Sequence, residues 1–207
     1  MTPSRPIIAF AVVCVLAGAS SRAFAQGGKP AMDHGKHRMG PDIVVPKGAP
    51  YTKADVEFMQ GMIAHHAQAI VMSRLAESHG ANSQVLRLSK KIDQSQVPEI
   101  HIMQDWLQRN KQFAPDTSSW RHMMMDGMLT TAQMQELMAA KGVDFDRAYL
   151  RYMIQHHDGA IKMVEDLFAK PLAGQEVDVN VFANDVVTVQ TAEIGIMQKM
   201  LTQLPEK

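Results

Sequence analysis

Apolar residues recur along most of this chain at the three-to-four-residue spacing of amphipathic helices, and Gly, Pro and Ser mark the breaks between these stretches. Thr52 with Asp55 three residues later is typical of a capping box at a helix start, and Gly80 is typical of a helix end. Pro98 is expected to kink or split the second helix. The pattern predicts four long helices, over residues 52–79, 83–110, 144–169 and 178–204, and a short helix over residues 130–141.

The chain also repeats itself. The stretch "M-I-A-H-H-A-Q-A-I-V-M" at residues 62–72 returns 91 residues later as "M-I-Q-H-H-D-G-A-I-K-M", and "E-I-x-I-M-Q" begins at both Glu99 and Glu193. One amphipathic hairpin cannot bury its apolar stripe alone, whereas two stacked hairpins can. We therefore predict an all-α four-helix bundle with internal pseudo-twofold symmetry. Its two repeated hairpins are expected over residues 52–110 and 144–204, with the short helix connecting them.

The first residues show the pattern of a secretory signal peptide. Arg5 supplies a positive start, an apolar run of 13 residues follows at 7–19, and "A-F-A" at 23–25 is typical of a signal-peptidase site. An uncleaved membrane anchor is the alternative. We expect a signal peptide at 1–25, a flexible tail containing Met and His at 26–50, and the helical domain at 51–207. The mature protein is then periplasmic or secreted and has no membrane span.

The composition indicates which metal ligands the protein can offer. The chain has 17 Met and 9 His, and its one cysteine leaves with the signal peptide. In an oxidising compartment a soft-metal site is safer with thioether and imidazole ligands, because they form no disulfides. The formal net charge of zero argues against a general nucleic-acid binder.

Helical geometry limits which of these residues share one ion. At about 100° per residue, Met62, His65 and Met72 fall on one stripe about 80° wide, with His66 at its edge. Met62 can converge with His65 or His66, whereas His65 and Met72 lie about 10.5 Å apart along the helix axis. A third ligand must therefore come from another helix. The main candidate ligands are those of the two motifs: Met62, His65, His66, Met72, Met153, His156, His157 and Met163. Further candidates are Met103 and Met197 as third ligands, His122, Met123, Met125 and Met128 in a predicted loop, and His34 and His37 in the tail.

Mixed thioether and imidazole ligands favour copper. Thioether sulfur is soft and neutral and prefers Cu(I) or Ag(I), while imidazole also suits Cu(II). Zinc fits less well, because thioether is a poor zinc ligand and no cysteine or carboxylate cluster accompanies the histidines.

Two other interpretations remain open at this stage. Met at helical spacing is commonly core filler, so the chain can be a structural or partner-binding bundle without metal. An enzyme is not expected: a di-iron bundle needs Glu-x-x-His pairs, and neither half contains one. We expect the inner stripes to carry no carboxylate, and the chain has no phosphate-binding loop or nucleophile elbow. A copper oxidoreductase is the remaining catalytic alternative.

The two His-His motifs, in "F-M-Q-G-M-I-A-H-H-A-Q-A-I-V-M" and "D-F-D-R-A-Y-L-R-Y-M-I-Q-H-H-D-G-A-I-K-M", resemble the family known as domain of unknown function 305, as does "G-M-L-T-T-A-Q-M-Q-E-L". The resemblance covers about residues 50–204. It implies an exported, ferritin-like four-helix bundle. Characterised relatives include periplasmic proteins that take up Cu(I) and Ag(I) through Met and His.

The sequence thus favours an exported copper-binding protein that sequesters or transfers Cu(I) and contributes to copper tolerance. Ag(I) and Cu(II) are alternative ions. The expected partners are copper ions and another periplasmic copper carrier or exporter.

Overall fold

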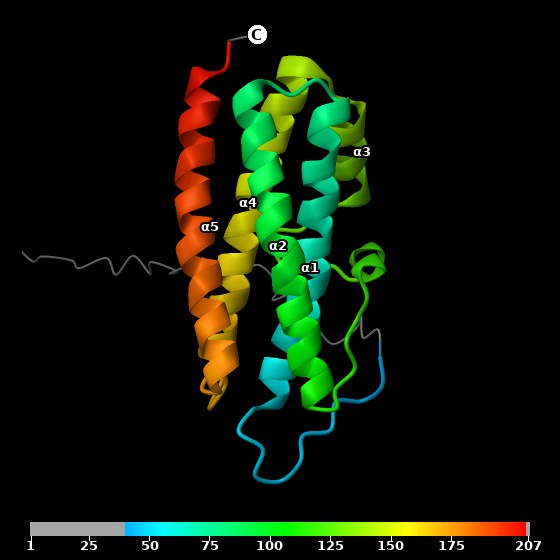
Figure 1. Cartoon of the computed structure of the whole chain (residues 1–207), viewed down its shortest axis with the longest axis vertical. Helices are drawn as coiled ribbons and strands as arrows, with labels where there is room; N and C mark the ends of the chain where they lie inside the picture. The colour runs from blue at the N-terminus through cyan, green and yellow to red at the C-terminus, as the bar shows by residue number, and fades with distance from the viewer. Residues whose placement is uncertain (1–39, 206–207) are drawn as a thin grey trace, which may run out of the picture. The chain divides into compact units, whose positions relative to one another are not determined.

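The computed structural model describes residues 40–205, and every regular element in that range is a helix (Figure 1). Each predicted helix is present, with ends within two residues of the expected ones. The elements are α1 (Lys53–Ser78), α2 (Ser83–Arg109), a short 3-10 helix η2 (Thr117–Arg121), α3 (Thr131–Ala139), α4 (Gly142–Phe168) and α5 (Val177–Gln203). The predicted signal peptide at 1–25 and the tail up to residue 39 lie outside the described residues.

Of the two outcomes expected at Pro98, a kink or a split, the split does not occur, because α2 runs unbroken through this residue. Proline removes one intrahelical hydrogen bond, and packing of the helix before and after Pro98 offsets that loss. Ile92 lies before Pro98 and Ile100 after it, and both are buried against the rest of the bundle. The capping box at the start of α1 is confirmed, since Thr52 and Asp55 exchange backbone and side-chain hydrogen bonds.

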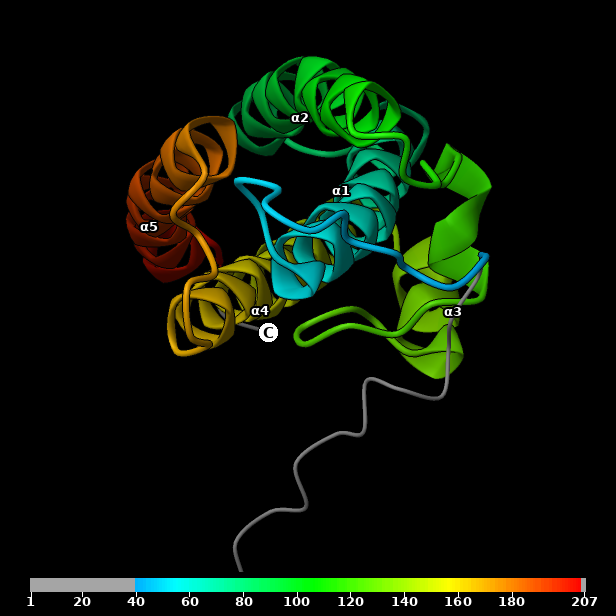
Figure 2. The ribbon, with the colours of Figure 1, turned by 90° about the horizontal axis from the view of Figure 1, so that it is seen from below.

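The two repeats form two hairpins, α1 with α2 and α4 with α5, and α1 also lies against α4. Seen end-on, α1 and α4 lie between α2 and α5 on one side and α3 on the other (Figure 2). No helix among the described residues has a stretch long and apolar enough to cross a membrane. Residues 40–50 carry no helix, and Ile43, Val45 and Ala49 pack partly buried against the bundle.

Helix α1 is buried on nearly all sides, which its stripe pattern did not predict. Every residue from Gly61 to Ile70 is buried. The cause is the connection between the hairpins, because η2 and the loop after it cover the face of α1 that would otherwise meet solvent. Gln68 on that face donates to the carbonyl of Leu129 and accepts from its amide, at 3.0 and 2.7 Å. The connecting segment is thus anchored to the repeat motif itself.

The apolar core consists of two clusters. On α4, Met153 belongs to one cluster and Ala160 to the other, so the His156–His157 pair lies where the two clusters meet. Buried polar side chains near this boundary come from α1, α4 and α5, at His65, His66, His157 and Glu193. The fold therefore places the repeated His-His motifs in a polar layer between two apolar halves.

Candidate metal site

The four motif histidines are fully buried at the centre of the bundle. His65 of α1 and His156 of α4 face each other, with ring centroids 3.7 Å apart and ring planes inclined by 43°. His66 and His157 lie next to them, each with its ring centroid 6.5 Å from that of its neighbour in sequence. The structure therefore brings both motifs together in one layer.

Three of these histidines have a fixed tautomer, because each ring contacts an oxygen that can only accept a hydrogen bond. The Nε2 of His66 lies 2.8 Å from Glu99 Oε2, and the Nε2 of His157 lies 2.9 Å from Glu193 Oε2. The Nε2 of His65 lies 3.1 Å from the backbone carbonyl of Asp126. In each neutral ring Nε2 therefore donates, and Nδ1 keeps an unshared electron pair.

Those Nδ1 atoms have no hydrogen-bond partner in residues 40–205, and neither nitrogen of His156 has one. A buried polar atom without a partner costs about 1–3 kcal/mol, so native proteins contain few of them. Here five such ring nitrogens belong to the two His-His pairs. A metal ion would bind those of them that carry no proton, which are the Nδ1 atoms of His65, His66 and His157 and one nitrogen of the neutral His156 ring.

Burial also keeps the central pair uncharged. Burial, and then the neighbouring imidazole of His66, lowers the pKa of His65 to about 3. Burial, followed by the nearby imidazoles, holds the pKa of His156 well below its ordinary value. Both rings are thus neutral near neutral pH, which is the form that binds metals.

Glu193 is held in its charged form. Burial alone would raise the pKa of Glu193, but its contact with His157 and the charge of Lys91 outweigh burial and lower it. The ammonium of Lys91 lies 3.3 Å from the second carboxylate oxygen. A carboxylate that accepts from a metal-binding imidazole orients the ring and raises its basicity.

The expectation that the inner stripes carry no carboxylate is therefore wrong. Glu99 and Glu193 come from α2 and α5, and each contacts the histidine of its own hairpin. A signal for them was present in the sequence, because "E-I-x-I-M-Q" repeats the glutamate together with the methionine. The predicted third ligands from that repeat are its methionines, Met103 and Met197, and do not include its glutamates.

The motif methionines are all buried, but the two of one motif do not lie in the same cluster. Met62 of the first motif shares a cluster with Met163 of the second and with Met103. The other cluster contains the three equivalent residues, Met72, Met153 and Met197. Each apolar half therefore holds thioethers from both repeats, together with the proposed third ligand from α2 or α5.

The predicted loop between the hairpins is confirmed around residues 122–130, but its candidate ligands are dispersed. His122 is exposed and Met123 is partly buried, whereas Met128 is buried and its sulfur accepts a hydrogen bond from the Met125 amide. Met125 lies over α1, where its methyl group approaches Gly61. His34 and His37 lie outside the described residues.

No three or more His, Cys, Asp and Glu side chains in the described part of the chain are close enough together to hold a metal. Nitrogen and oxygen ligands alone therefore do not complete a site there. A metal bound at the histidines would also need sulfur from the neighbouring methionines.

Residues 55–201 match the family described as domain of unknown function DUF305. A solved DUF305 fragment from Deinococcus radiodurans is 30% identical, with a TM-score of 0.65 over 75% of this chain and 100% of that one. A DUF305 protein from Streptomyces coelicolor, described as a candidate for secretion, is 29% identical with a TM-score of 0.63, over 72% of this chain and 93% of its own. The comparison with curated proteins finds no match.

The fold is also similar to that of CopM. The Cu(I)-bound form of CopM is 26% identical, with a TM-score of 0.58 over 72% of this chain and 96% of that one. The forms of CopM with bound Cu(II) and with bound Ag match at 26% identity as well, with TM-scores of 0.57.

Proposed function

The chain belongs to the DUF305 family, and from this premise we propose that it is an exported protein that binds Cu(I) and sequesters it or hands it on. Ag(I) and Cu(II) are further ions that the same ligands suit. The role that we propose is binding rather than catalysis, and it contributes to copper tolerance.

The observation that carries this proposal is the set of unpartnered ring nitrogens at His65, His66, His156 and His157. A structural role for these residues would favour either full hydrogen bonding or apolar replacements, because unpaired polar atoms in a dry core destabilise the fold. Copper coordination removes that cost. It also explains why the Nε2 atoms are held by acceptors while the Nδ1 atoms are left free.

The neighbouring ligands favour a soft monovalent ion. Met62, Met103 and Met163 lie in one flanking cluster and their three counterparts in the other, and all six thioethers are buried. Neutral thioethers and imidazoles add no negative charge, so they suit Cu(I) or Ag(I) better than a hard divalent ion. The known copper- and silver-bound forms of the structurally similar CopM support the same choice.

Export rests on the N-terminal pattern of the sequence. A positive start, an apolar run and a small-residue site at residues 1–25 are typical of a signal peptide. An exported copper binder needs a source or recipient of its ion, and we propose another copper carrier or an exporter in the same compartment.

Competition with a chromogenic Cu(I) chelator tests the function directly. The mature protein, without the predicted signal peptide and without an affinity tag, is titrated anaerobically, and we expect it to bind Cu(I) more tightly than free methionine and histidine do. The double variant His66→Ala with His157→Ala should bind less copper and keep its helical circular dichroism. His101→Ala, at an exposed position on α2, is the matched control and should bind like the wild type.

Thermal melts separate this function from that of a purely structural bundle. An ion that binds only the folded state must raise the melting temperature, so Ag(I) should stabilise the wild type and stabilise the double variant less. Identical melts with and without Ag(I), or collapse of the helical signal in the double variant, would instead support a structural role for the histidines.

A further inference from the structure

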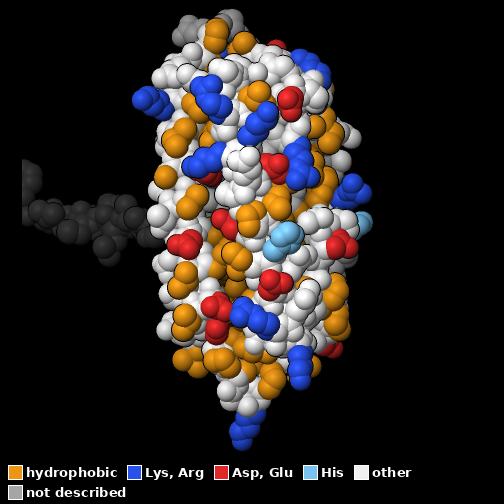
Figure 3. All heavy atoms as spheres, in the orientation of Figure 1, with side chains coloured by type: hydrophobic (Ala, Val, Ile, Leu, Met, Phe, Trp, Pro, Cys, Tyr) orange, Lys and Arg blue, Asp and Glu red, His pale blue; other side chains and the backbone are white. Residues whose placement is uncertain are grey.

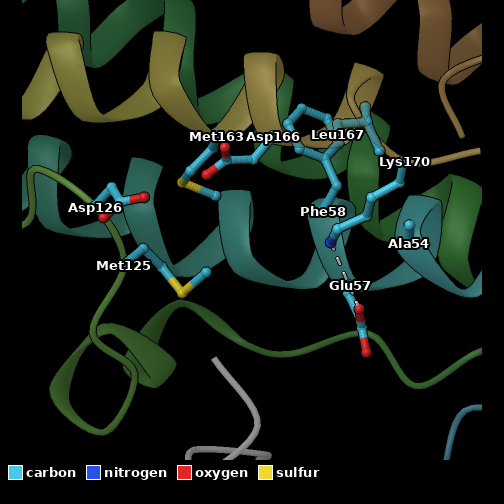
Figure 4. Close-up of a pocket in the computed structure, with 9 residues that line it drawn as sticks. All are labelled: Ala54, Glu57, Phe58, Met125, Asp126, Met163, Asp166, Leu167 and Lys170. Atoms are coloured by element: carbon cyan, nitrogen blue, oxygen red, sulfur yellow. Dashed lines mark ion pairs between the residues drawn. The ribbon is translucent and has the colours of Figure 1, made fainter. Parts of the chain in front are cut away.

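A hollow opens on the surface between α1, α4 and the loop at residues 122–130. Its volume is 70 Å³, and one buried water needs about 10–15 Å³ of such space, so the hollow admits a partly hydrated ion. Met125 from the loop and Met163 from α4 both line it (Figure 4). Two thioethers thus reach one surface hollow from two different elements.

Gly61 of α1 makes room for both of them. A Cβ atom at this position would lie 2.7 Å from the Met125 methyl carbon and 3.4 Å from that of Met163. The two side chains therefore converge over the bare backbone of α1. The second repeat carries Tyr152 at the equivalent position, so the two halves of the molecule differ here.

The charges around the hollow favour a cation. Glu57, Asp126 and Asp166 line it, against the single positive charge of Lys170. Glu57 forms ion pairs with Lys53 and Lys170, and Asp166 forms one with Lys162. The Asp126 carboxylate makes no hydrogen bond or close ion pair within residues 40–205, although the ammonium of Lys162 is near enough to feel its charge.

A groove between α2 and α5 provides the contrast. It is lined by Arg87, Lys91 and Lys199, and Lys and Arg side chains gather over this part of the face shown in Figure 3. The groove contains the thioether of Met200 but no carboxylate. A cation is repelled there and attracted to the hollow beside Met125.

Two residues that line the hollow also belong to the surroundings of the buried site. Met163 lines the hollow and belongs to the same apolar cluster as Met62 and Met103. The backbone carbonyl of Asp126 accepts the hydrogen bond from His65. Met163 and Asp126 therefore connect the surface hollow with the ligands of the interior.

We propose that this hollow is the port at which the protein captures Cu(I), with the Met125 and Met163 thioethers as first ligands and Asp126 as the counter-charge. The inference rests on the proposed copper function. After capture, Met163 stays on the ion while a deeper thioether or imidazole nitrogen replaces Met125. All exchanging ligands are neutral, so this step moves neither a proton nor an electron.

Stopped-flow loading tests the port. Cu(I) is supplied as its complex with a chromogenic chelator, and the loss of absorbance reports transfer to the mature protein. Met125→Leu should load about tenfold more slowly, equal to about 1.4 kcal/mol on the barrier, with unchanged stoichiometry at equilibrium. Met138→Leu, at an exposed methionine on α3, is the control and should load like the wild type.

Asp126→Asn removes the charge and leaves the backbone carbonyl in place. It should slow loading by about tenfold at low ionic strength and by much less in high salt, because screening already weakens the attraction in the wild type. If the ratio of the two loading rates is the same at low and at high salt, the Asp126 carboxylate does not attract the ion.

The outcomes separate the port from the copper function. If the wild type binds Cu(I) but loads no faster than Met125→Leu, the hollow is not the port, and the proposed copper function is unaffected. A Met125→Leu protein that loads at the normal rate but holds less copper makes Met125 a storage ligand, which also overturns the port. A wild type that takes up no Cu(I) at all overturns the proposed function itself, and the port with it.

Discussion

At the scale of single residues, the unit of this site is an imidazole with one nitrogen held by an acceptor and the other left free. His66 and His157 both follow this pattern, but their glutamate partners differ in exposure. The side chain of Glu99 is 27% exposed, whereas that of Glu193 is 2% exposed. Water can take over from a lost carboxylate at the first position far more easily than at the second.

This difference makes a prediction for a matched pair of variants. Glu193→Gln should lower the Cu(I) affinity by about 10–100-fold, the usual effect of removing a carboxylate that orients a metal-binding histidine. Glu99→Gln should have a clearly smaller effect. Chelator competition on both proteins measures it, with circular dichroism as the check on folding. Equal losses at the two positions would show that burial of the carboxylate is not what matters.

At the scale of elements, the loop at residues 122–130 lies directly on α4. Gly159 permits this contact, because its Cβ would lie 2.1 Å from the backbone oxygen of Asp126 and 2.5 Å from the Cα of Gly127. The equivalent position of the first repeat is Gln68, which hydrogen-bonds the backbone of Leu129. The same position in both repeats thus anchors the connecting segment, by different chemistry.

We predict opposite effects for two glycine-to-alanine changes. Gly159→Ala should destabilise the protein by about 1–3 kcal/mol, since backbone atoms cannot move aside as a flexible side chain can. Gly195→Ala, in α5 with no atom within 4 Å of the added Cβ, should stabilise it by about 0.5–1 kcal/mol. Urea unfolding of both variants measures the two free energies. A stable Gly159→Ala protein would mean that the loop is not held against α4 in solution.

The helices were predictable from sequence because helix formation follows local spacing, caps and breaks, as at Thr52 and Gly80. The all-round burial of α1 was not predictable, since it depends on a loop far along the chain that covers its outer face. The contact of Glu193 with His157 likewise depends on the register between α4 and α5. The repeat places Glu99 and Glu193 at equivalent positions, but a sequence alone does not distinguish a buried glutamate from an exposed one before its partner is known.

At the scale of the whole molecule, the two repeats contribute to shared clusters rather than to separate sites. Met62 and Met163, from different motifs, lie in one apolar cluster, and Met72 and Met153 lie in the other. His65 and His156, also from different motifs, lie ring against ring at the boundary between these clusters. A change at this boundary therefore acts on both hairpins at once, and its effect should appear in the stability of the entire bundle.

The pH dependence of that stability is the last prediction. The pKa of His65 falls from 6.5 in the unfolded chain to about 3 in the folded protein, and the pKa of His156 is also lowered by burial. Because the unfolded chain binds more protons between these values, the free energy of unfolding should fall as pH decreases below 6.5. Each ring contributes up to about 1.4 kcal/mol per pH unit.

The measurement is urea unfolding of the metal-free protein, with a chelator present, between about pH 7.5 and 5, above the ordinary range of carboxyl groups. The pKa of Glu193 is lowered in the folded protein, so Glu193 reduces the free energy of unfolding only at pH values below this interval. Burial raises the pKa of Asp146, so Asp146 instead increases the free energy of unfolding as the pH falls. His156→Phe keeps a ring against His65 but cannot be protonated, so its pH slope should be about half that of the wild type. A flat profile in the wild type would mean that water or a proton reaches the His65 and His156 rings in the folded state, and the dry layer on which the copper site depends would not exist.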